Sequence, residues 1–527
     1  MTEHKHIGKI VGALMAAAVA FCLIVTLFAD RFVAVSGSSA ATMEYESTLF
    51  DTSEIMTVNI IMDEDQWQEL LDNAISEEYY ACDVEINGET ISNVGIRAKG
   101  NTSLSSIAND PDTDRYSFKI KFDKYVDGQT CMGLDKLVLN NNFADATNRK
   151  EALVYDMFQY LGADASLYNY AKISVNGEYW GTYLALEAVE DSFKLRNYGV
   201  SDGKLYKPET MGMGNDQKED GGKPDGNPPE RPDNADFPSS EAEFPDFPDD
   251  MDFGDVPDRN VDTDVGTNAD SDTSTFDSSE GNLAKDNNPM DRPERPQGDF
   301  DQADMDEKFR NPQGDPGDFG GFGNRNRGAD LNYTDDDADS YSTIWDGADG
   351  KVTDSDKERV VTAIKNINEG TDLTTYLDVD NILKYMAVHE FVVNLDSLSG
   401  NMAHNYYLYE NDGQLNIIPW DYNLSFGGMT NGEMGGGPER NSTENSGATG
   451  MINDPIDTPF DGTDFFDALL ENEEYLAQYH EYLRQLAEEY VQGGRLQEVW
   501  ERLDAQTDEL IETDPTAFYT AAEYEEA

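Results

Sequence analysis

Residues 394–427 read NLDSLSGNMAHNYYLYENDGQLNIIPWDYNLSFG, and this stretch decides the fold that we expect. The run before it, residues 377–394, has the apolar spacing of a helix. Residues 405–410 and 414–420 are separated by a turn signal, which predicts a pair of strands. The predicted order is therefore helix, loop, strand pair and Asp421.

Three polar residues in this stretch have the spacing of a phosphoryl-transfer site. Asp396 precedes Asn401 by five residues, and Asp421 follows the two strands. Kinases need a carboxylate that orients or deprotonates the acceptor hydroxyl, together with an Asn and a second Asp that hold magnesium, and they place these groups in this order. The spacing alone is a weak signal, because both residue types also favour turns, so a turn or loop role is the alternative.

The segments upstream follow the order of a kinase N-terminal lobe. Residues 115–122 (RYSFKIKF) predict a strand on which Lys119 and Lys121 share a face. A lysine there would meet nucleotide phosphates, although exposed strand lysines also protect sheet edges. A helix over 148–161 and a hairpin within 171–186 come next. The likeness at this point is one of fold order.

Other N-terminal segments predict further strands and one helix. Residues 57–62 read as a strand, and residues 80–96 read as a hairpin that turns at Asn87-Gly88. Residues 63–74 predict a helix capped by Asp63. Two more local signals are the turn pair Asn176-Gly177 and the helix-ending Gly162.

The chain is strongly acidic, with a formal net charge of -69 over 527 residues. This charge argues against a nucleic-acid partner, because phosphate binding needs a basic surface. It suits divalent cations, cationic partners or solubility outside a cell, and acidic loops that only keep the chain soluble are the plain alternative.

Much of the negative charge is expected in residues 208–335, which are rich in Asp, Pro, Gly and Asn and poor in aliphatic side chains. Such a segment buries too little apolar surface to offset its ordering entropy, so we predict a disordered acidic insertion. Calcium binding is an alternative to a solvated linker, but the acidic clusters do not match an EF-hand loop.

Residues 10–29 (IVGALMAAAVAFCLIVTLFA) contain no charged residue. Twenty helical residues span about 30 Å, the thickness of the hydrocarbon core of a bilayer. Lys5 and Lys9 precede the run and place that end in the cytoplasm. We expect a single-pass anchor with the rest of the chain outside. A cleaved signal peptide is the alternative, and it exports the same residues.

Two cysteines, Cys82 and Cys131, follow the apolar run. One disulfide between them is conceivable, but the sequence does not show their separation, so paired and free thiols both stay open. No two histidines have the ligand spacing of a zinc site in a structured segment.

Several phrases of the chain carry a resemblance. They are Arg97-Ala-Lys-Gly-Asn-Thr-Ser, Ser117-Phe-Lys-Ile-Lys-Phe, Asn148-Arg-Lys, Val175-Asn-Gly-Glu-Tyr-Trp-Gly-Thr-Tyr-Leu-Ala-Leu-Glu187, Leu205-Tyr-Lys207, Asn405-Tyr-Tyr-Leu-Tyr and Ile418-Pro-Trp-Asp-Tyr-Asn-Leu-Ser-Phe-Gly427. Together they resemble the spore-coat protein H (CotH) family of atypical protein kinases over about residues 55–210 and 340–430.

The resemblance implies ATP with Mg²⁺ or Mn²⁺ and phosphorylation of Ser or Thr in secreted or spore-surface proteins. It implies Asp396 as the catalytic carboxylate and Asp421 as a metal ligand. Asn401, or alternatively Asn405, would be the second metal-side group. Family members commonly carry an Asp where this chain has Asn423, which offers an oxygen without a charge.

The resemblance also implies roles in the first lobe. Lys121 or Lys119 would touch the nucleotide phosphates, and Arg97 would belong to a loop over them. Glu187 would lie at the nucleotide edge or pair with that lysine.

The expected fold class is α+β, an atypical protein-kinase-like fold of two lobes after a single N-terminal transmembrane helix. The expected divisions are a cytoplasmic stub 1–9, an anchor 10–29, a linker 34–54, a strand-rich N-lobe 55–207, the acidic insertion 208–335, a catalytic and metal-binding part 340–460 and C-terminal helices 461–527.

The expected function is that of an extracytoplasmic, membrane-anchored kinase acting on a secreted or surface protein, and the acidic surface suits a basic, Ser-rich substrate. One alternative is a non-catalytic surface or spore-coat assembly protein that keeps the fold. Another is an acidic, cation-binding adhesin.

Overall fold

The computed structural model describes part of the chain, and the described residues belong to one compact unit. They are residues 41–210, 327–400, 403–430, 433–434, 455–457, 460 and 463–527. The predicted anchor at 10–29 and most of the predicted acidic insertion lie outside these ranges.

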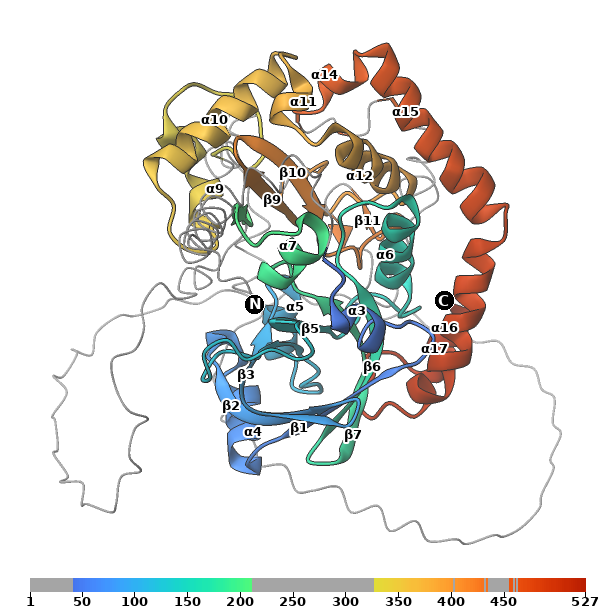
Figure 1. Cartoon of the computed structure of the whole chain (residues 1–527). Helices are drawn as coiled ribbons and strands as arrows, with labels where there is room; N and C mark the ends of the chain where they lie inside the picture. The colour runs from blue at the N-terminus through green and yellow to red at the C-terminus, as the bar shows by residue number, and fades with distance from the viewer. Residues whose placement is uncertain are drawn as a thin grey trace, which may run out of the picture. The chain divides into compact units, whose positions relative to one another are not determined.

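The first part of the chain forms a closed barrel of strands in the order β1-β2-β3-β4-β5-β7-β6 (Figure 1). All neighbouring strands are antiparallel except β1 and β6, which run parallel and close the barrel. The strands are β1 Met56–Ile61, β2 Tyr80–Ile86, β3 Glu89–Lys99, β4 Ser117–Lys121, β5 Lys136–Asn140, β6 Tyr168–Val175 and β7 Glu178–Glu187.

Alternation of side chains explains how the barrel is filled. Val84, Ile96 and Phe118 come from neighbouring strands and are fully buried in one apolar cluster. Residues two apart on a strand share a face, so the intervening side chains point to the other face of the sheet. That other face carries the charged residues of β3, β4 and β5.

Local signals in the sequence explain the turns and helix ends of this part. Both hairpin turns have positive φ at the Asn and the Gly, with Asn87 at 49° and Gly88 at 85°, as a type I′ turn requires. Asp63 accepts a hydrogen bond from the backbone N–H of Asp65 and caps helix α4, Glu64–Asp72. Gly162 has φ of 69° and ends helix α6, Lys150–Leu161. These predictions are confirmed.

The second part of the fold is a small sheet among helices. Its strands are ordered β10-β9-β8, with β8 Lys204–Tyr206, β9 Tyr406–Asn411 and β10 Gln414–Pro419. The longer helices are α7 Asp191–Tyr198, α10 Asp354–Asn368, α12 Val379–Phe391, α15 Glu473–Arg484 and α16 Arg495–Glu512. Shorter ones are α3 Glu44–Thr48, α5 Thr102–Ala108, α9 Ser342–Asp346, α11 Leu373–Tyr376, α14 Asp467–Leu470 and α17 Ala521–Glu526. The mixed α+β class is therefore confirmed.

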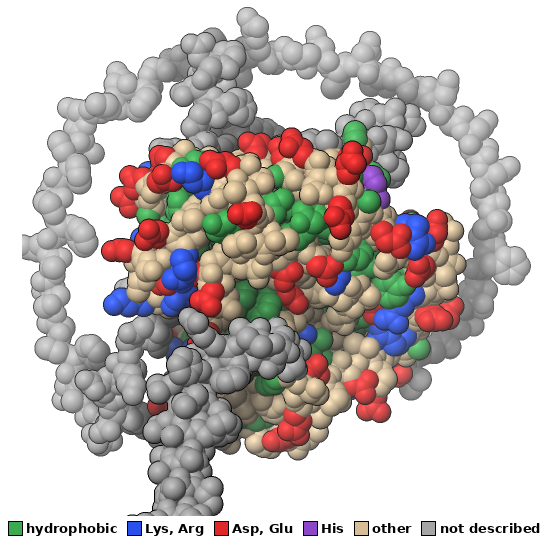
Figure 2. All heavy atoms as spheres, turned by 45° about the horizontal axis from the view of Figure 1, so that its top comes forward, with side chains coloured by type: hydrophobic (Ala, Val, Ile, Leu, Met, Phe, Trp, Pro, Cys, Tyr) green, Lys and Arg blue, Asp and Glu red, His purple; other side chains and the backbone are tan. Residues whose placement is uncertain are grey.

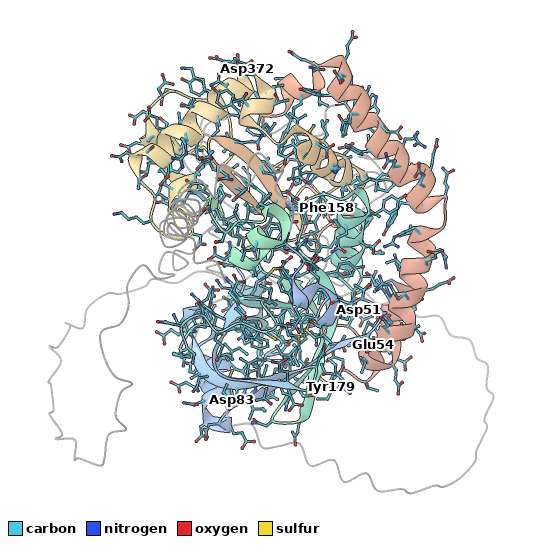
Figure 3. All side chains as sticks on the ribbon, viewed as in Figure 1. Asp51, Glu54, Asp83, Phe158, Tyr179 and Asp372 are labelled. Carbon is cyan, nitrogen blue, oxygen red and sulfur yellow. The ribbon has the colours of Figure 1, made fainter. Side chains whose placement is uncertain are left out.

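Helix α6 connects the two parts through its apolar face. Phe158 lies between them in Figure 3, with its ring centroid 6.3 Å from that of Tyr385 on α12. The Phe158 ring also meets the Tyr422 ring edge-on at 5.3 Å. The helix is thus packed against the loop that follows β10, one residue from Asp421.

The expected linker at 34–54 is wrong over its described residues. Helix α3 lies within it, and Tyr45 and Leu49 are fully buried. The Tyr45 hydroxyl donates to Glu187 Oε1 at 2.6 Å. Tyr45 and Leu49 belong to the apolar cluster of the barrel, so this segment is part of the folded unit.

The C-terminal boundary of the predicted insertion also needs correction. Ala329 and Leu331 are fully buried in the apolar core, and the Tyr406 hydroxyl donates to the carbonyl of Ala329 at 2.5 Å. The ordered second part therefore begins by residue 327 and not after 335.

The C-terminal helices return to the barrel, where Figure 1 shows α16 and α17 near β6 and β7. Arg115 and Asp514 form an ion pair of 2.9 Å in which both side chains are 2% exposed. Asp514 also accepts from the backbone N–H of Thr182 on β7 at 2.8 Å. Charged contacts that are this well buried hold the chain end against the barrel.

Within the described ranges, no helix has the length and apolar character needed to cross a membrane. Cys82 and Cys131 are both described, and each is a buried free thiol. On the face that Figure 2 shows, Asp and Glu side chains are spread widely and Lys and Arg form separate groups.

Candidate functional site

Asp396 lies in the loop that follows α12, where neighbouring side chains hold its carboxylate from two sides. His404 Nε2 lies 2.7 Å from Asp396 Oδ1. Asn405 Nδ2 donates to Asp396 Oδ2 at 3.1 Å and to the Asp396 carbonyl at 2.8 Å. Each carboxylate oxygen therefore has a defined partner, and the orientation of Asp396 is set by its own loop.

The base of the same loop is built on His389, near the end of α12. Its Nε2 lies 2.6 Å from Ser399 Oγ and 3.2 Å from Ser397 Oγ, and its Nδ1 lies 3.2 Å from the Tyr422 hydroxyl. Burial lowers the pKa of His389 to about 3, although a hydrogen bond with the backbone of Asn394 acts to raise it. The ring is therefore neutral at physiological pH. His389 thus ties the loop of Asp396 to the loop after β10.

Asp421 comes directly after β10 and has a positive φ of 62°, a conformation uncommon for a residue other than glycine. Burial raises the pKa of Asp421, and the charge of Asp396 adds to the rise. Lys99, Lys207 and His404 act in the opposite direction. The pKa of Asp421 therefore depends on a second carboxylate from another loop and on three cationic groups.

Lys99, the last residue of β3, is the barrel lysine that influences Asp421. Its Nζ donates to Asn140 Oδ1 at 2.9 Å, and Asn140 Nδ2 donates to Glu151 Oε2 at 2.8 Å. Burial lowers the pKa of Lys99, which Asp421 and Glu151 oppose. Protein kinases pair a strand lysine with a helix glutamate. Here an asparagine stands between the two.

Lys207 approaches the same region from the end of β8. Its Nζ lies 6.0 Å from the centroid of the Tyr407 ring and 2.5 Å from Glu209 Oε1. The charge of Lys207 acts on both Lys99 and Asp421. Cations from both parts of the fold thus face the two aspartates in a chain whose net charge is -69.

The predicted phosphate lysines lie on β4, one strand further from this cluster. Lys119 pairs with Arg97 across the sheet and Lys121 pairs with Gly95. Lys119 and Lys121 therefore share a face with Arg97 and Lys99. Lys99 is the lysine of this face whose charge acts on Asp421.

The expected pairing of Glu187 with a strand lysine is wrong. Glu187 is fully buried and accepts from the guanidinium of Arg196 at 2.6 Å, 3.0 Å and 3.2 Å. It also accepts from Tyr45 and from the backbone N–H of Leu167. These partners come from α3, from α7 and from the residue before β6, so Glu187 holds these elements together at the end of β7.

The expected place of Arg97 in a loop is also wrong. Arg97 lies within β3, is buried, and forms an ion pair of 2.6 Å with Glu77. It remains two residues from Lys99 on the same face. Its charge acts on Lys99, so it contributes to the positive potential there.

The predicted metal-side asparagines have different hydrogen-bond partners in the structure. Asn405 donates its amide to Asp396, as described above. Asn423 Nδ2 donates to the carbonyl of Phe143 in the loop before α6 at 2.9 Å. Asn401 lies outside the described residues. Asn405 and Asn423 thus each have the nitrogen end of the amide committed to a protein acceptor.

The residues present fit a divalent cation of the kind that nucleotides carry. Over the described part of the chain, no group of three or more His, Cys, Asp or Glu side chains is arranged to hold a metal alone. Mg²⁺ in nucleotide sites usually takes one or two carboxylates and completes its shell with phosphates and water. Asp421 and the buried, partly unsatisfied Glu151 supply that number.

Comparison with known families shows which family the chain belongs to. The model of a family described as CotH kinase protein matches residues 96–243 and 294–527, well over half of the chain. The chain belongs to the CotH kinase family. No curated protein matches it. As a CotH family member it is a kinase-like protein, and the resemblance expected from its sequence phrases is confirmed.

Several residues of this CotH site were missed in the sequence. Lys99 lies inside the phrase Arg97-Ala-Lys-Gly, which carried a usable signal. Glu151 belongs to the helix predicted over 148–161, but its contact with Asn140 depends on how that helix packs against the barrel. His404 lies eight residues after its partner Asp396, so no local pattern joins them.

Proposed function

We propose that this CotH protein is an ATP-dependent protein kinase that phosphorylates Ser or Thr. The observation that carries the proposal is that His389 ties the loop of Asp396 to Tyr422, the residue after Asp421, while Lys99 Nζ lies 5.7 Å from the centroid of the Trp420 ring just before it. Phosphoryl transfer is mainly a matter of positioning and electrostatic stabilisation. The two aspartates and Lys99 can supply both the positioning and the electrostatic stabilisation.

Asp396 has the geometry of the group that orients the acceptor. His404 and Asn405 hold its carboxylate. In the proposed reaction the hydroxyl oxygen of Ser or Thr forms a bond to the γ-phosphorus as the bond to the β,γ-bridging oxygen breaks. The hydroxyl proton passes to Asp396, and ADP leaves with the bridging oxygen.

Lys99 and its neighbours have the charge to hold the phosphates. Lys99 is kept in place by Asn140 and lies 5.7 Å from the centroid of the Trp420 ring. Arg97, Lys119 and Lys121 continue the positive face along the sheet. A divalent cation bound at Asp421 would neutralise charge on the β- and γ-phosphates.

The proposed site of action is outside the cytoplasm. The charge-free run at 10–29, with lysines before it, supports a single-pass anchor that leaves the CotH domain outside. A secreted or surface protein is then the proposed substrate. A basic, Ser-rich one suits the acidic surface, because opposite charge speeds association.

A second candidate function is a non-catalytic surface or coat assembly protein. Asn423 favours it, because this residue brings no charge to the metal side and donates its amide to Phe143. The two candidates differ in nucleotide binding, which the assembly role does not need.

The experiment that tests the proposal uses the purified full-length chain with labelled ATP and Mg²⁺ or Mn²⁺. Two peptides with the same Ser, one Lys-rich and one Glu-rich, are offered at low salt, and a Lys-rich peptide with Ala for Ser is the control. We expect label on the Lys-rich Ser peptide first. Equal or faster labelling of the acidic peptide would contradict the substrate proposal, and no labelling of any peptide or of the chain itself would favour the assembly role.

A further inference from the structure

Glu151, in the first turn of α6, is unusual because its carboxyl group is buried, with only 4% of the residue exposed. Its Oε2 accepts from Asn140 Nδ2 at 2.8 Å. No side chain in the described part of the chain donates to its Oε1, although the backbone N–H of Tyr422 lies close enough to the carboxyl to lower its pKa against the effect of burial. Buried polar atoms are nearly always partnered, so one that is not needs a reason.

The surroundings of Glu151 suggest that reason. Helix α6 packs against the loop of Asp421, because the ring of Tyr155, one turn after Glu151, meets the ring of Tyr422 edge-on at 6.5 Å. Asp396 adds a third acidic group on the side of Asp421. Lys99 is shared among these acids, and Lys207 is paired with Glu209. Asn140 therefore links Glu151 to Lys99, and Lys99 in turn lies near Trp420, the residue before Asp421.

Asn423, two residues after Asp421, supplies no second acid to the cation. It is neutral, and its nitrogen donates to the Phe143 carbonyl. Glu151 belongs to α6, which packs on Tyr422 between Asp421 and Asn423. Because Asn140 holds only one of its carboxylate oxygens, the other remains available to a ligand.

We propose that Glu151 is the second acidic ligand of the divalent cation, together with Asp421. This inference rests on the proposed function, since phosphate oxygens of the nucleotide and water would complete the coordination. Asn140 is then a positioning residue that joins Lys99 to Glu151. Cation binding would connect α6 directly to the loop after β10.

The test measures Mn²⁺ binding to the full-length chain by electron paramagnetic resonance, with Mn²⁺ alone and with Mn²⁺ plus ADP. Four variants are compared with the wild type. They are Glu151→Gln, Asp421→Asn, Asn423→Ala and, as a control on an exposed residue of β7, Glu178→Gln. Glu151→Gln keeps the shape and an oxygen that accepts from Asn140, and it removes the charge.

We expect Glu151→Gln and Asp421→Asn each to weaken Mn²⁺ binding in the presence of ADP by at least about tenfold, in the range seen when the surroundings of a bound metal are altered. Asn423→Ala should weaken it less than Glu151→Gln does, and Glu178→Gln should leave it unchanged. If Glu151→Gln binds Mn²⁺ as the wild type does while Asp421→Asn does not, the role of Glu151 is refuted and the kinase proposal stands. If the wild type binds no Mn²⁺ with ADP, the proposed function itself fails.

Thermal unfolding separates loss of the ligand from loss of the fold. Without metal, Glu151→Gln should unfold at the wild-type temperature or above it, because it relieves repulsion from Asp421. With Mn²⁺ and ADP, the wild type should gain stability by mass action and Glu151→Gln should gain much less. Equal gains in the two proteins would overturn the proposal.

Discussion

His404 Nε2 lies 2.7 Å from Asp396 Oδ1, and the contact joins two residues of one loop whose ends lie at α12 and β9. The pKa of His404 is raised by its bond to Asp396 and by that carboxylate's charge, although burial, the largest influence, opposes the rise. The orientation of the proposed catalytic carboxylate therefore depends on His404.

Replacing His404 tests this dependence. We expect His404→Ala to lower kcat by about 10- to 100-fold, the usual loss when an outer partner of an active-site ligand is removed. The KM for ATP should change little, because His404 contacts Asp396 and not the basic face of the barrel. Steady-state kinetics check both constants, and His404→Gln should restore part of kcat. An unchanged kcat with a raised KM would place His404 at the nucleotide.

The choice of phosphate lysine is a second test. Lys99→Met should weaken ATP binding or turnover by about 100-fold, as when one preorganised donor is removed from an active site. Lys121→Met is the matched control, since it removes the same charge from the same face one strand away. Calorimetry with ADP and Mg²⁺ measures both variants. A larger loss in Lys121→Met would restore the lysine expected from the sequence.

The buried His389 predicts how stability depends on pH. Its folded pKa of about 3 lies below the unfolded value of 6.5, so its contribution is present above about pH 6.5 and is lost as the pH falls toward 3. Between pH 7.5 and pH 5 this amounts to about 2 kcal/mol. Urea unfolding at both pH values should show a smaller loss for His389→Gln than for the wild type. Equal losses would mean that His389 is charged in the folded state.

The ion pair between Arg115 and Asp514 predicts the role of the chain end. Asp514→Ala leaves Arg115 buried without its partner, and we expect a loss of about 3–5 kcal/mol in the free energy of unfolding. Glu509→Ala, on an exposed position of α16, should change it by less than about 0.5 kcal/mol. Similar effects of the two changes in urea unfolding would mean that the C-terminal contact does not hold the barrel.

Local signals predicted most of the secondary structure, because their physical cause lies within a few residues. The Asn-Gly turn at 87–88 and the helix end at Gly162 need positive φ, which these residue types adopt readily. Local signals could not predict which side chains meet when the elements pack together. Glu187 lies at a strand end as expected, but Arg196, nine residues later on α7, takes up its carboxylate.

The site was predicted in outline for a related reason. Asp396 and Asp421 stood out through their order along the chain, and in the structure His389 joins the loop of Asp396 to Tyr422, the residue after Asp421. Period-two alternation put Lys119 and Lys121 on one face, yet it could not show that Lys99, on the neighbouring strand, ends beside Trp420. Buried segments such as α3 were too short to carry a periodic signal.

The central claim is that Asp396 and Asp421 form the phosphoryl-transfer site. The most direct measurement is transfer of the labelled γ-phosphate of ATP by the full-length chain and by its Asp396→Ala and Asp421→Ala variants, with ADP binding measured in parallel. The account predicts transfer by the wild type, loss of transfer in both variants, and loss of metal-dependent ADP binding in Asp421→Ala alone. Undiminished transfer in either variant, with both folded, would contradict it.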